Sequence, residues 1–65
     1  MNKYKVVDTY EGFDLIGYAN TLKEVKQLAK QQYEDCDGEC SICYYPLNEK
    51  TQKYDRSKIK FLETF

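Results

Sequence analysis

Residues 21–38 read TLKEVKQLAKQQYEDCDG, and this stretch decides the fold because it carries the clearest helical signal in the chain. Thr21 followed three residues later by Glu24 is a capping box, in which both side chains satisfy amides of the opening turn. Gly38 is a natural stop for the helix. One face of the helical wheel carries seven residues at helical spacing: Leu22, Val25, Leu28, Ala29, Gln32, Tyr33 and Cys36. The pattern predicts a helix over residues 21–36.

The residues before this helix predict two strands. Residues 4–10 (YKVVDTY) and 13–19 (FDLIGYA) are rich in β-branched and aromatic residues and flank Glu11-Gly12. A two-residue loop that ends in Gly predicts a β-hairpin with Tyr10 opposite Phe13. In that register, the more apolar face should meet the core, and it carries Tyr4, Val6, Asp8, Tyr10, Phe13, Leu15, Gly17 and Ala19.

Two further strands are expected after the helix. Residues 39–47 (ECSICYYPL) predict a third strand, which Pro46 should end or place at an edge. A polar turn over 48–52 precedes a last strand within 54–64, where Ile59 and Phe61, continued by Phe65 just beyond it, alternate with Lys58, Lys60 and Leu62. The order ββαββ predicts a single α+β domain over residues 1–65, with one helix packed on one face of a small antiparallel sheet.

The amino-acid composition limits the classes of function that the chain can have. The chain has 65 residues, ten Lys and Arg against eleven Asp and Glu, and no His. Without His the usual proton carrier near neutral pH is missing, and so small a domain has little room for a substrate pocket beside its core. We therefore expect no enzymatic activity and no cofactor. No apolar run is long enough for a membrane span or a signal peptide, so we expect a cytoplasmic protein.

The spacing of the three cysteines suggests a possible metal site. Cys36, Cys40 and Cys43 form C-x3-C-x2-C. Structural zinc takes four Cys or His ligands, and Cys40 and Cys43 should point to opposite faces of one strand. We therefore predict no metal site within one chain, while a site shared across a dimer stays open. A Cys36–Cys40 disulfide is sterically feasible, but a reducing cytosol disfavours it.

A charge pattern is the strongest functional signal. Four acidic residues lie within six positions at the C-terminal end of the helix: Glu34, Asp35, Asp37 and Glu39. The helix dipole disfavours anions at this end, which favours a role in docking to a basic site on a partner. In the alternative interpretation these carboxylates are merely solvated, or face the basic segment over residues 50–60.

A single helix covers only one face of a sheet, so the other face should expose Val7, Ile16, Tyr18, Cys43 and Tyr45. We predict apolar partner contacts at Ile16, Tyr18 and Tyr45. Alternatively, the tyrosines only stabilise cross-strand pairs, or the face closes a homodimer. A third alternative is nucleic-acid binding, with bases stacked on this face and phosphates bound by the basic segment. A pI near 5.3 argues against it. Its phosphate ligands would be Lys53, Arg56, Lys58 and Lys60.

Residues 4–45, YKVVDTYEGFDLIGYANTLKEVKQLAKQQYEDCDGECSICYY, resemble small uncharacterised proteins of phages and prophages of Gram-positive bacteria. The shared features are a hairpin, a TLKEV-type capped helix, a DGEC-type turn and a strand. The resemblance implies a phage or mobile-element protein that binds a host enzyme or defence complex and modulates or inhibits it in the host cytoplasm. A protein partner is thus the first expectation and nucleic acid the second, with no membrane partner.

Overall fold

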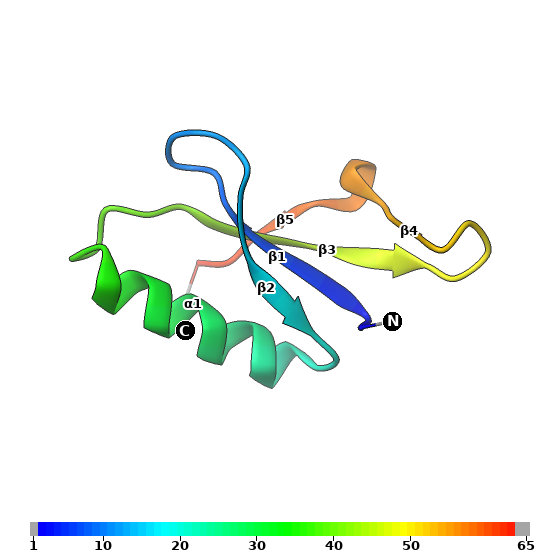
Figure 1. Ribbon diagram of the computed structural model, residues 1–65, viewed down its shortest axis with the longest axis horizontal. Coiled ribbons are helices and arrows are strands. Elements are labelled where there is room, and N and C mark those ends of the chain that lie inside the picture. The colour runs from blue at the N-terminus through cyan, green and yellow to red at the C-terminus, as the bar shows by residue number, and fades with distance from the viewer. Residues whose placement is uncertain (1, 64–65) are drawn as a thin grey trace.

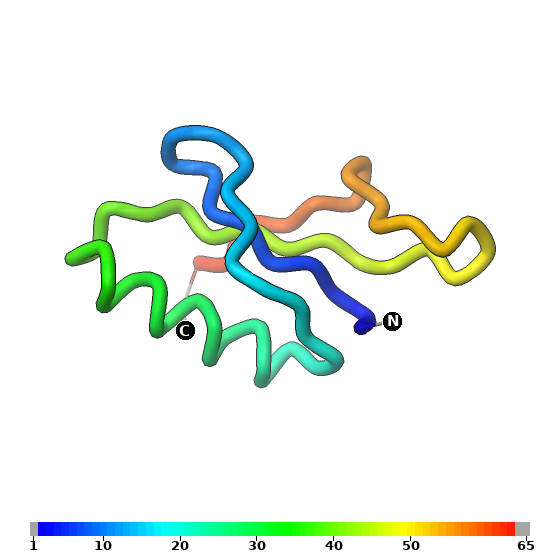
Figure 2. The backbone as a smooth tube through the Cα atoms, viewed as in Figure 1, coloured from blue at the N-terminus to red at the C-terminus, as the bar shows by residue number. Residues whose placement is uncertain are grey.

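The computed structural model describes residues 2–63 and confirms the ββαββ order of an α+β domain (Figures 1 and 2). One helix lies against an antiparallel, curled sheet. In chain order, the elements are β1 (Tyr4–Asp8), β2 (Asp14–Ala19), α1 (Leu22–Asp35), β3 (Ile42–Asn48), β4 (Lys53–Tyr54), the short 3-10 helix η1 (Arg56–Lys58) and β5 (Lys60–Phe61). Phe65, which the sequence places in the last strand, lies outside the described residues.

The sheet has the order β2-β1-β3-β4, and β5 also pairs with β3. The two short strands share one edge of β3, because Cys43 lies opposite Phe61 in β5 and Leu47 lies opposite Tyr54 in β4. That edge is therefore covered by the chain itself. The opposite edge of the sheet is β2, which pairs only with β1 among the described strands.

The helix begins and ends as predicted. The Glu24 N–H donates to the Thr21 hydroxyl oxygen at 3.2 Å, and the Glu24 carboxylate accepts from the Asn20 N–H at 3.3 Å. At the other end, the Gly38 N–H donates to the Tyr33 carbonyl at 2.9 Å, with a φ of 82° at Gly38. Such a left-handed conformation favours glycine, so local chemistry accounts for both helix ends.

The predicted two-residue hairpin loop is wrong. Residues 9–13 connect β1 to β2, and Tyr10 and Phe13 are not paired. The Asp8 side chain ends β1 early, because its Oδ1 accepts from the Tyr10 N–H at 3.0 Å and turns the chain. The Thr9 N–H then donates to the Ser41 carbonyl at 2.8 Å, which draws the chain toward the start of β3.

The hairpin register is right at one end and shifted at the other. Tyr4 lies opposite Ala19 and Val6 opposite Gly17, as the predicted register implies. A β-bulge follows, so that Val7 lies opposite Leu15 and Ile16 is the extra residue. The bulge places the Ile16 side chain against the helix-side core and leaves Leu15 exposed, which reverses the predicted positions of both residues.

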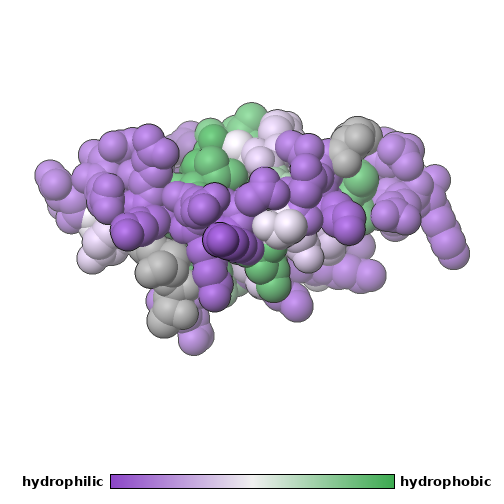
Figure 3. All heavy atoms as spheres, turned by 90° about the horizontal axis from the view of Figure 1, so that it is seen from below, coloured by the Kyte–Doolittle hydropathy of each residue, from purple (hydrophilic) through white to green (hydrophobic). Residues whose placement is uncertain are grey.

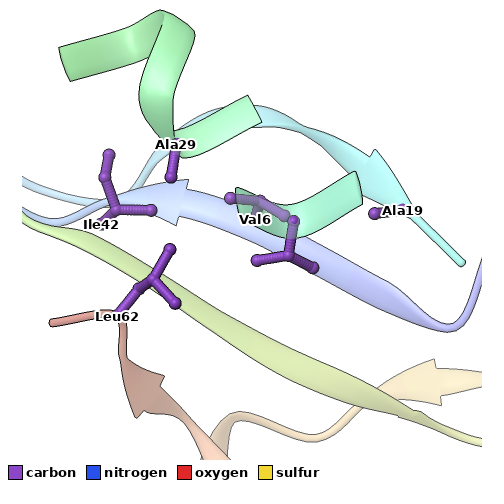
Figure 4. Packing of buried hydrophobic residues seen from close by; sticks show 6 residues of the cluster. Val6, Ala19, Ala29, Ile42 and Leu62 are labelled. Carbon is purple, nitrogen blue, oxygen red and sulfur yellow. The ribbon is translucent and has the colours of Figure 1, made fainter. Parts of the chain in front are cut away.

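The main core lies between α1 and the sheet (Figure 4). Its buried members are Val6, Ala19, Val25, Ala29, Ile42 and Leu62. Leu62 comes just after β5 and is held there by its N–H, which donates to the Ile42 carbonyl at 2.9 Å. The outward surface near α1 is mostly hydrophilic, with separate hydrophobic areas, as expected for an amphipathic helix (Figure 3).

The sheet face away from α1, called the second face below, is partly closed. Val7, Cys43 and Tyr45 form a second buried cluster there, with Tyr54 packed against it. The Tyr54 ring lies 5.5 Å from the Tyr18 ring and 6.4 Å from the Tyr45 ring, and its hydroxyl donates to the Asn2 carbonyl at 2.7 Å. The expectation that Val7, Cys43 and Tyr45 are exposed is therefore wrong.

Candidate functional site

The hairpin loop and the turn after α1 meet at one end of the molecule (Figure 1). Two contacts join them besides the Thr9–Ser41 backbone bond: the Thr9 hydroxyl donates to the Ser41 carbonyl at 3.1 Å, and the Ser41 N–H donates to Asp8 Oδ1 at 3.0 Å. These bonds bring carboxylates from distant parts of the sequence together. From the sequence, only the carboxylates at the C-terminal end of the helix were predicted to form a candidate site.

Asp8 is the structural centre of this junction. Its side chain is only 6 % exposed and accepts three hydrogen bonds, from the N–H groups of Tyr10 and Ser41 and from Gln32 Nε2 at 3.2 Å. Burial raises the pKa of Asp8, but the three hydrogen bonds outweigh it and hold the pKa below its ordinary value. A charged, fully bonded Asp8 therefore ties β1, α1 and β3 together.

A hollow of about 290 Å³ opens beside Asp8. It is lined by four carboxylates and three other side chains, namely Asp8, Glu11, Asp14, Glu39, Tyr10, Gln32 and Cys36. Asp8, Glu11 and Asp14 were not predicted from the sequence as site residues. Their only sequence signal is an acidic hairpin loop, and nothing local indicates that this loop folds back onto the helix turn.

The four acidic residues predicted from the sequence are all exposed. Glu39 lines the hollow beside Asp8, and Asp35 lines a separate hollow with Ile16. Glu34 and Asp37 line neither of these hollows. The turn that carries the acidic residues lies toward the opposite end of the molecule from the turn over 49–52 (Figure 1). The acidic turn therefore does not face the lysine-bearing β3–β4 turn.

The cysteines are free thiols, with Cys43 buried and the other two half-buried. Burial is the main cause that raises the pKa of Cys36, and the negative charges of Asp8, Asp35, Asp37 and Glu39 raise it further. Burial, followed by the charge of Asp8, also raises the pKa of Cys40. A thiol with a raised pKa is a poor nucleophile at neutral pH. Across residues 2–63, no three His, Cys, Asp or Glu side chains are grouped so that they could hold a metal ion.

The three residues predicted to make apolar contacts with a partner have different environments in the structure. Tyr18 is exposed on the second face, where it was expected. Tyr45 is only 2 % exposed and offers no surface to a partner. Ile16 is half-buried on the helix side because of the bulge. Tyr18 therefore remains available in the predicted role, and Ile16 can contact a partner only where it lines the hollow with Asp35.

The alternative basic residues lie along the covered sheet edge. Lys53 is in β4, Arg56 and Lys58 are in η1, and Lys60 is in β5, all of them exposed. The Arg56 guanidinium lies 4.0 Å from the centroid of the Phe13 ring, a cation–π contact that links η1 to the hairpin loop. Arg56 therefore has a structural partner of its own.

Comparison with protein-family models, with curated proteins and with solved structures finds no match to this chain. Within the described part of the chain, no helix is long and apolar enough to cross a bilayer. The function of this chain is therefore inferred from the surfaces described above.

Proposed function

We propose that this chain is a non-enzymatic protein-binding module whose acidic end receives a basic segment of a partner protein. The acidic end is defined by the carboxylates of the hairpin and of the turn after α1: Asp8, Glu11, Asp14, Glu34, Asp35, Asp37 and Glu39. The observation that carries the proposal is that four of these carboxylates, from the hairpin and from the turn after α1, line one hollow of a chain whose net charge is only −1.

The placement of these charges is unfavourable for the fold itself. Glu34 and Asp35 end α1, where the helix dipole repels anions, and the last turn of α1 contains no basic residue. Concentrated like charge also raises the free energy of the folded state through self-repulsion. A binding role explains why the chain carries such a cluster, because a negative end steers a basic partner and orients it on arrival.

The proposal includes a biological setting. The resemblance of residues 4–45 to small phage and prophage proteins supports a phage or mobile-element product that acts in the cytoplasm of its host. Its partner would be a host enzyme or defence complex, whose activity it modulates or inhibits. The basic segment it meets on such a protein would be one that binds an anionic substrate, such as a nucleic-acid groove.

One observation supports nucleic-acid binding as a second candidate function. Tyr18 and Phe61 both keep about half of their surface exposed, and both lie on the second face. Exposed rings of this kind can stack with single-stranded bases. The buried Tyr45 and the Arg56–Phe13 contact weaken this candidate, because they remove two of its expected ligands.

Affinity capture from a lysate of a Gram-positive host, with and without nuclease, separates the two candidates. The charge-reversed variant Asp35→Lys/Glu39→Lys tests the acidic end, since both side chains are exposed. Asp37 is left unchanged because its φ of 54° favours Asp over Lys. The matched control Glu49→Lys/Glu63→Lys makes the same change in net charge at exposed positions outside the acidic end.

The proposal predicts a protein that survives nuclease and is retained by the wild type and the control but lost by the acidic-end variant. Retention by all three forms would contradict it. If the captured protein disappears after nuclease treatment, the chain binds nucleic acid instead. The candidate phosphate ligands would then be Lys53, Arg56, Lys58 and Lys60.

A further inference from the structure

The edge of β2 is open. Besides its ladder with β1, no hydrogen bond among the described residues uses the backbone of Asp14–Ala19. An edge strand presents alternate N–H and C=O groups outward, where another extended chain can pair with them. Lys and Pro, which commonly protect such edges, are absent from Asp14–Ala19, and the bulge at Ile16 is the one irregularity that interrupts this edge. The opposite edge of the sheet, in contrast, is covered by β4 and β5.

A groove runs beside this edge, between β2 and α1. Three hollows of about 280, 190 and 290 Å³ make it up. The first two share Leu28 and Gln31, and the last two share Gln32, so they follow one another along the helix. The residues that α1 contributes to the first two hollows lie on one helical face: Glu24, Gln27, Leu28, Gln31, Gln32 and Asp35.

The charged residues that line this groove all have one sign. Glu24 lies toward one end, Asp35 follows, and four carboxylates surround the last hollow: Asp8, Glu11, Asp14 and Glu39. Among the described residues that line the three hollows, none is Lys or Arg. The groove therefore combines open backbone hydrogen-bonding groups on one side with negative charge along its floor and end.

We propose that an extended basic segment of the partner protein pairs with the open edge of β2 and seats its basic side chains in the groove between β2 and α1. This inference depends on the function proposed above and specifies how the partner binds. Main-chain pairing supplies affinity in this mode, and side chains at alternate positions supply specificity. The six residues of β2 can pair with a segment about 20 Å long.

Charge selects this occupant over a second copy of the chain. Two copies joined edge to edge through β2 would bring two grooves of the same negative sign together, and like charges across an interface oppose association. A basic segment instead neutralises the groove. Its side chains alternate between the two faces of the sheet, so every second residue should be Lys or Arg.

The test uses fluorescein-labelled (Lys-Thr)4, whose lysines occupy every second position. Amide chemical shifts of the ¹⁵N-labelled protein locate the bound peptide, and fluorescence anisotropy gives its affinity at low salt. A fully N-methylated (Lys-Thr)4 keeps the charge and removes every backbone donor. We expect shifts at residues 14–19 and along the groove, and binding at least tenfold weaker for the methylated peptide, since several main-chain hydrogen bonds are lost.

Variants test the charged lining. Asp14→Asn/Asp35→Asn removes two exposed groove carboxylates and should weaken binding of (Lys-Thr)4 roughly tenfold. Glu49→Gln/Glu63→Gln removes the same charge elsewhere and should leave the affinity unchanged. Circular dichroism confirms that each variant is folded.

Three results of the peptide experiments would overturn the inference: equal binding of both peptides, shifts confined to residues outside the groove, or no binding of (Lys-Thr)4. None of these would overturn the proposed function, which fails if the captured partner is retained after charge reversal at the acidic end or if the capture disappears with nuclease. Dimerisation through β2, seen as concentration-dependent shifts without peptide, would also overturn the inference.

Discussion

The substitution Asp8→Ala tests the junction on which the acidic end is built. It removes both carboxylate oxygens, leaves the N–H groups of Tyr10 and Ser41 without their acceptor, and leaves Gln32 Nε2 with only the Cys36 sulfur. Each unsatisfied buried backbone donor costs about 1–3 kcal/mol. Water reaches part of this junction, because Tyr10 is exposed, so we expect a loss of about 3 kcal/mol in the free energy of unfolding.

The conservative substitution Asp8→Asn separates hydrogen bonding from charge. Both backbone donors bind the same oxygen, Oδ1, and an Asn side chain can keep that oxygen in place. The Gln32 amide can turn its oxygen toward the new amino group. We therefore expect Asp8→Asn to lose only about 1 kcal/mol, the difference between a charge-assisted and a neutral hydrogen bond.

The dependence on pH provides an independent check. The pKa of Asp8 is lower in the folded protein than its ordinary value, so the carboxylate stabilises the fold above the unfolded-state pKa. This contribution disappears as the pH falls through the folded pKa, in the acid range below about pH 4. The wild type should therefore lose more stability than Asp8→Asn between about pH 5 and about pH 2.5.

Urea denaturation followed by far-UV circular dichroism measures these differences at each pH. A domain of this size is stabilised by only about 3–10 kcal/mol, so a loss of 3 kcal/mol is easily resolved. If Asp8→Ala lost less than about 1 kcal/mol and kept the acid sensitivity of the wild type, Asp8 would not hold the three elements together.

Three further substitutions test the rest of the fold by the same denaturation assay. Thr21→Ala removes the helix cap and should cost about 1 kcal/mol, whereas Thr21→Ser should keep most of it. Tyr54→Phe removes the hydrogen bond to the Asn2 carbonyl and should cost about 1 kcal/mol; an unchanged midpoint would show that this bond contributes nothing. Gly38→Ala meets both a φ of 82° and the Tyr33 ring at 3.2 Å, so a loss of about 1–2 kcal/mol is expected, and a more stable variant would contradict this conformation.

Local chemistry made the helix predictable. Thr21, Glu24 and Gly38 act on backbone groups within a few residues of themselves, so their effects can be derived from the sequence alone. The same holds for the order of the strands, because β-branched and aromatic residues mark each of them.

Long-range contacts explain what the sequence did not reveal. The hairpin loop is held not only by the local Asp8–Tyr10 bond but also by the bond from Asp8 to Ser41, which lies 33 residues away. The bulge at Ile16 shifts the register between β1 and β2, and no local pattern marks its position. The second face is closed by Tyr54, whose position depends on how β4 pairs with the end of β3. No local pattern encodes either contact.

The candidate site also has one part that the sequence predicts and one part that depends on long-range contacts. Its helical half, Glu34 to Glu39, is visible as a run of acidic residues. Its hairpin half, Asp8, Glu11 and Asp14, joins only when the loop folds back onto the helix turn. The predicted use of Tyr45 as a contact is wrong for a related reason, since a buried ring in a second core cluster cannot be recognised without the strands that cover it.

The central claim is that the acidic end binds a basic protein segment. Its most direct test is the affinity of the captured partner for the wild type, for Asp35→Lys/Glu39→Lys and for Glu49→Lys/Glu63→Lys, measured by isothermal titration calorimetry at low and moderate salt. We predict an affinity at least tenfold weaker for the acidic-end variant and unchanged for the control, with a difference that shrinks as salt increases. Equal affinities for all three proteins at low salt would contradict the claim.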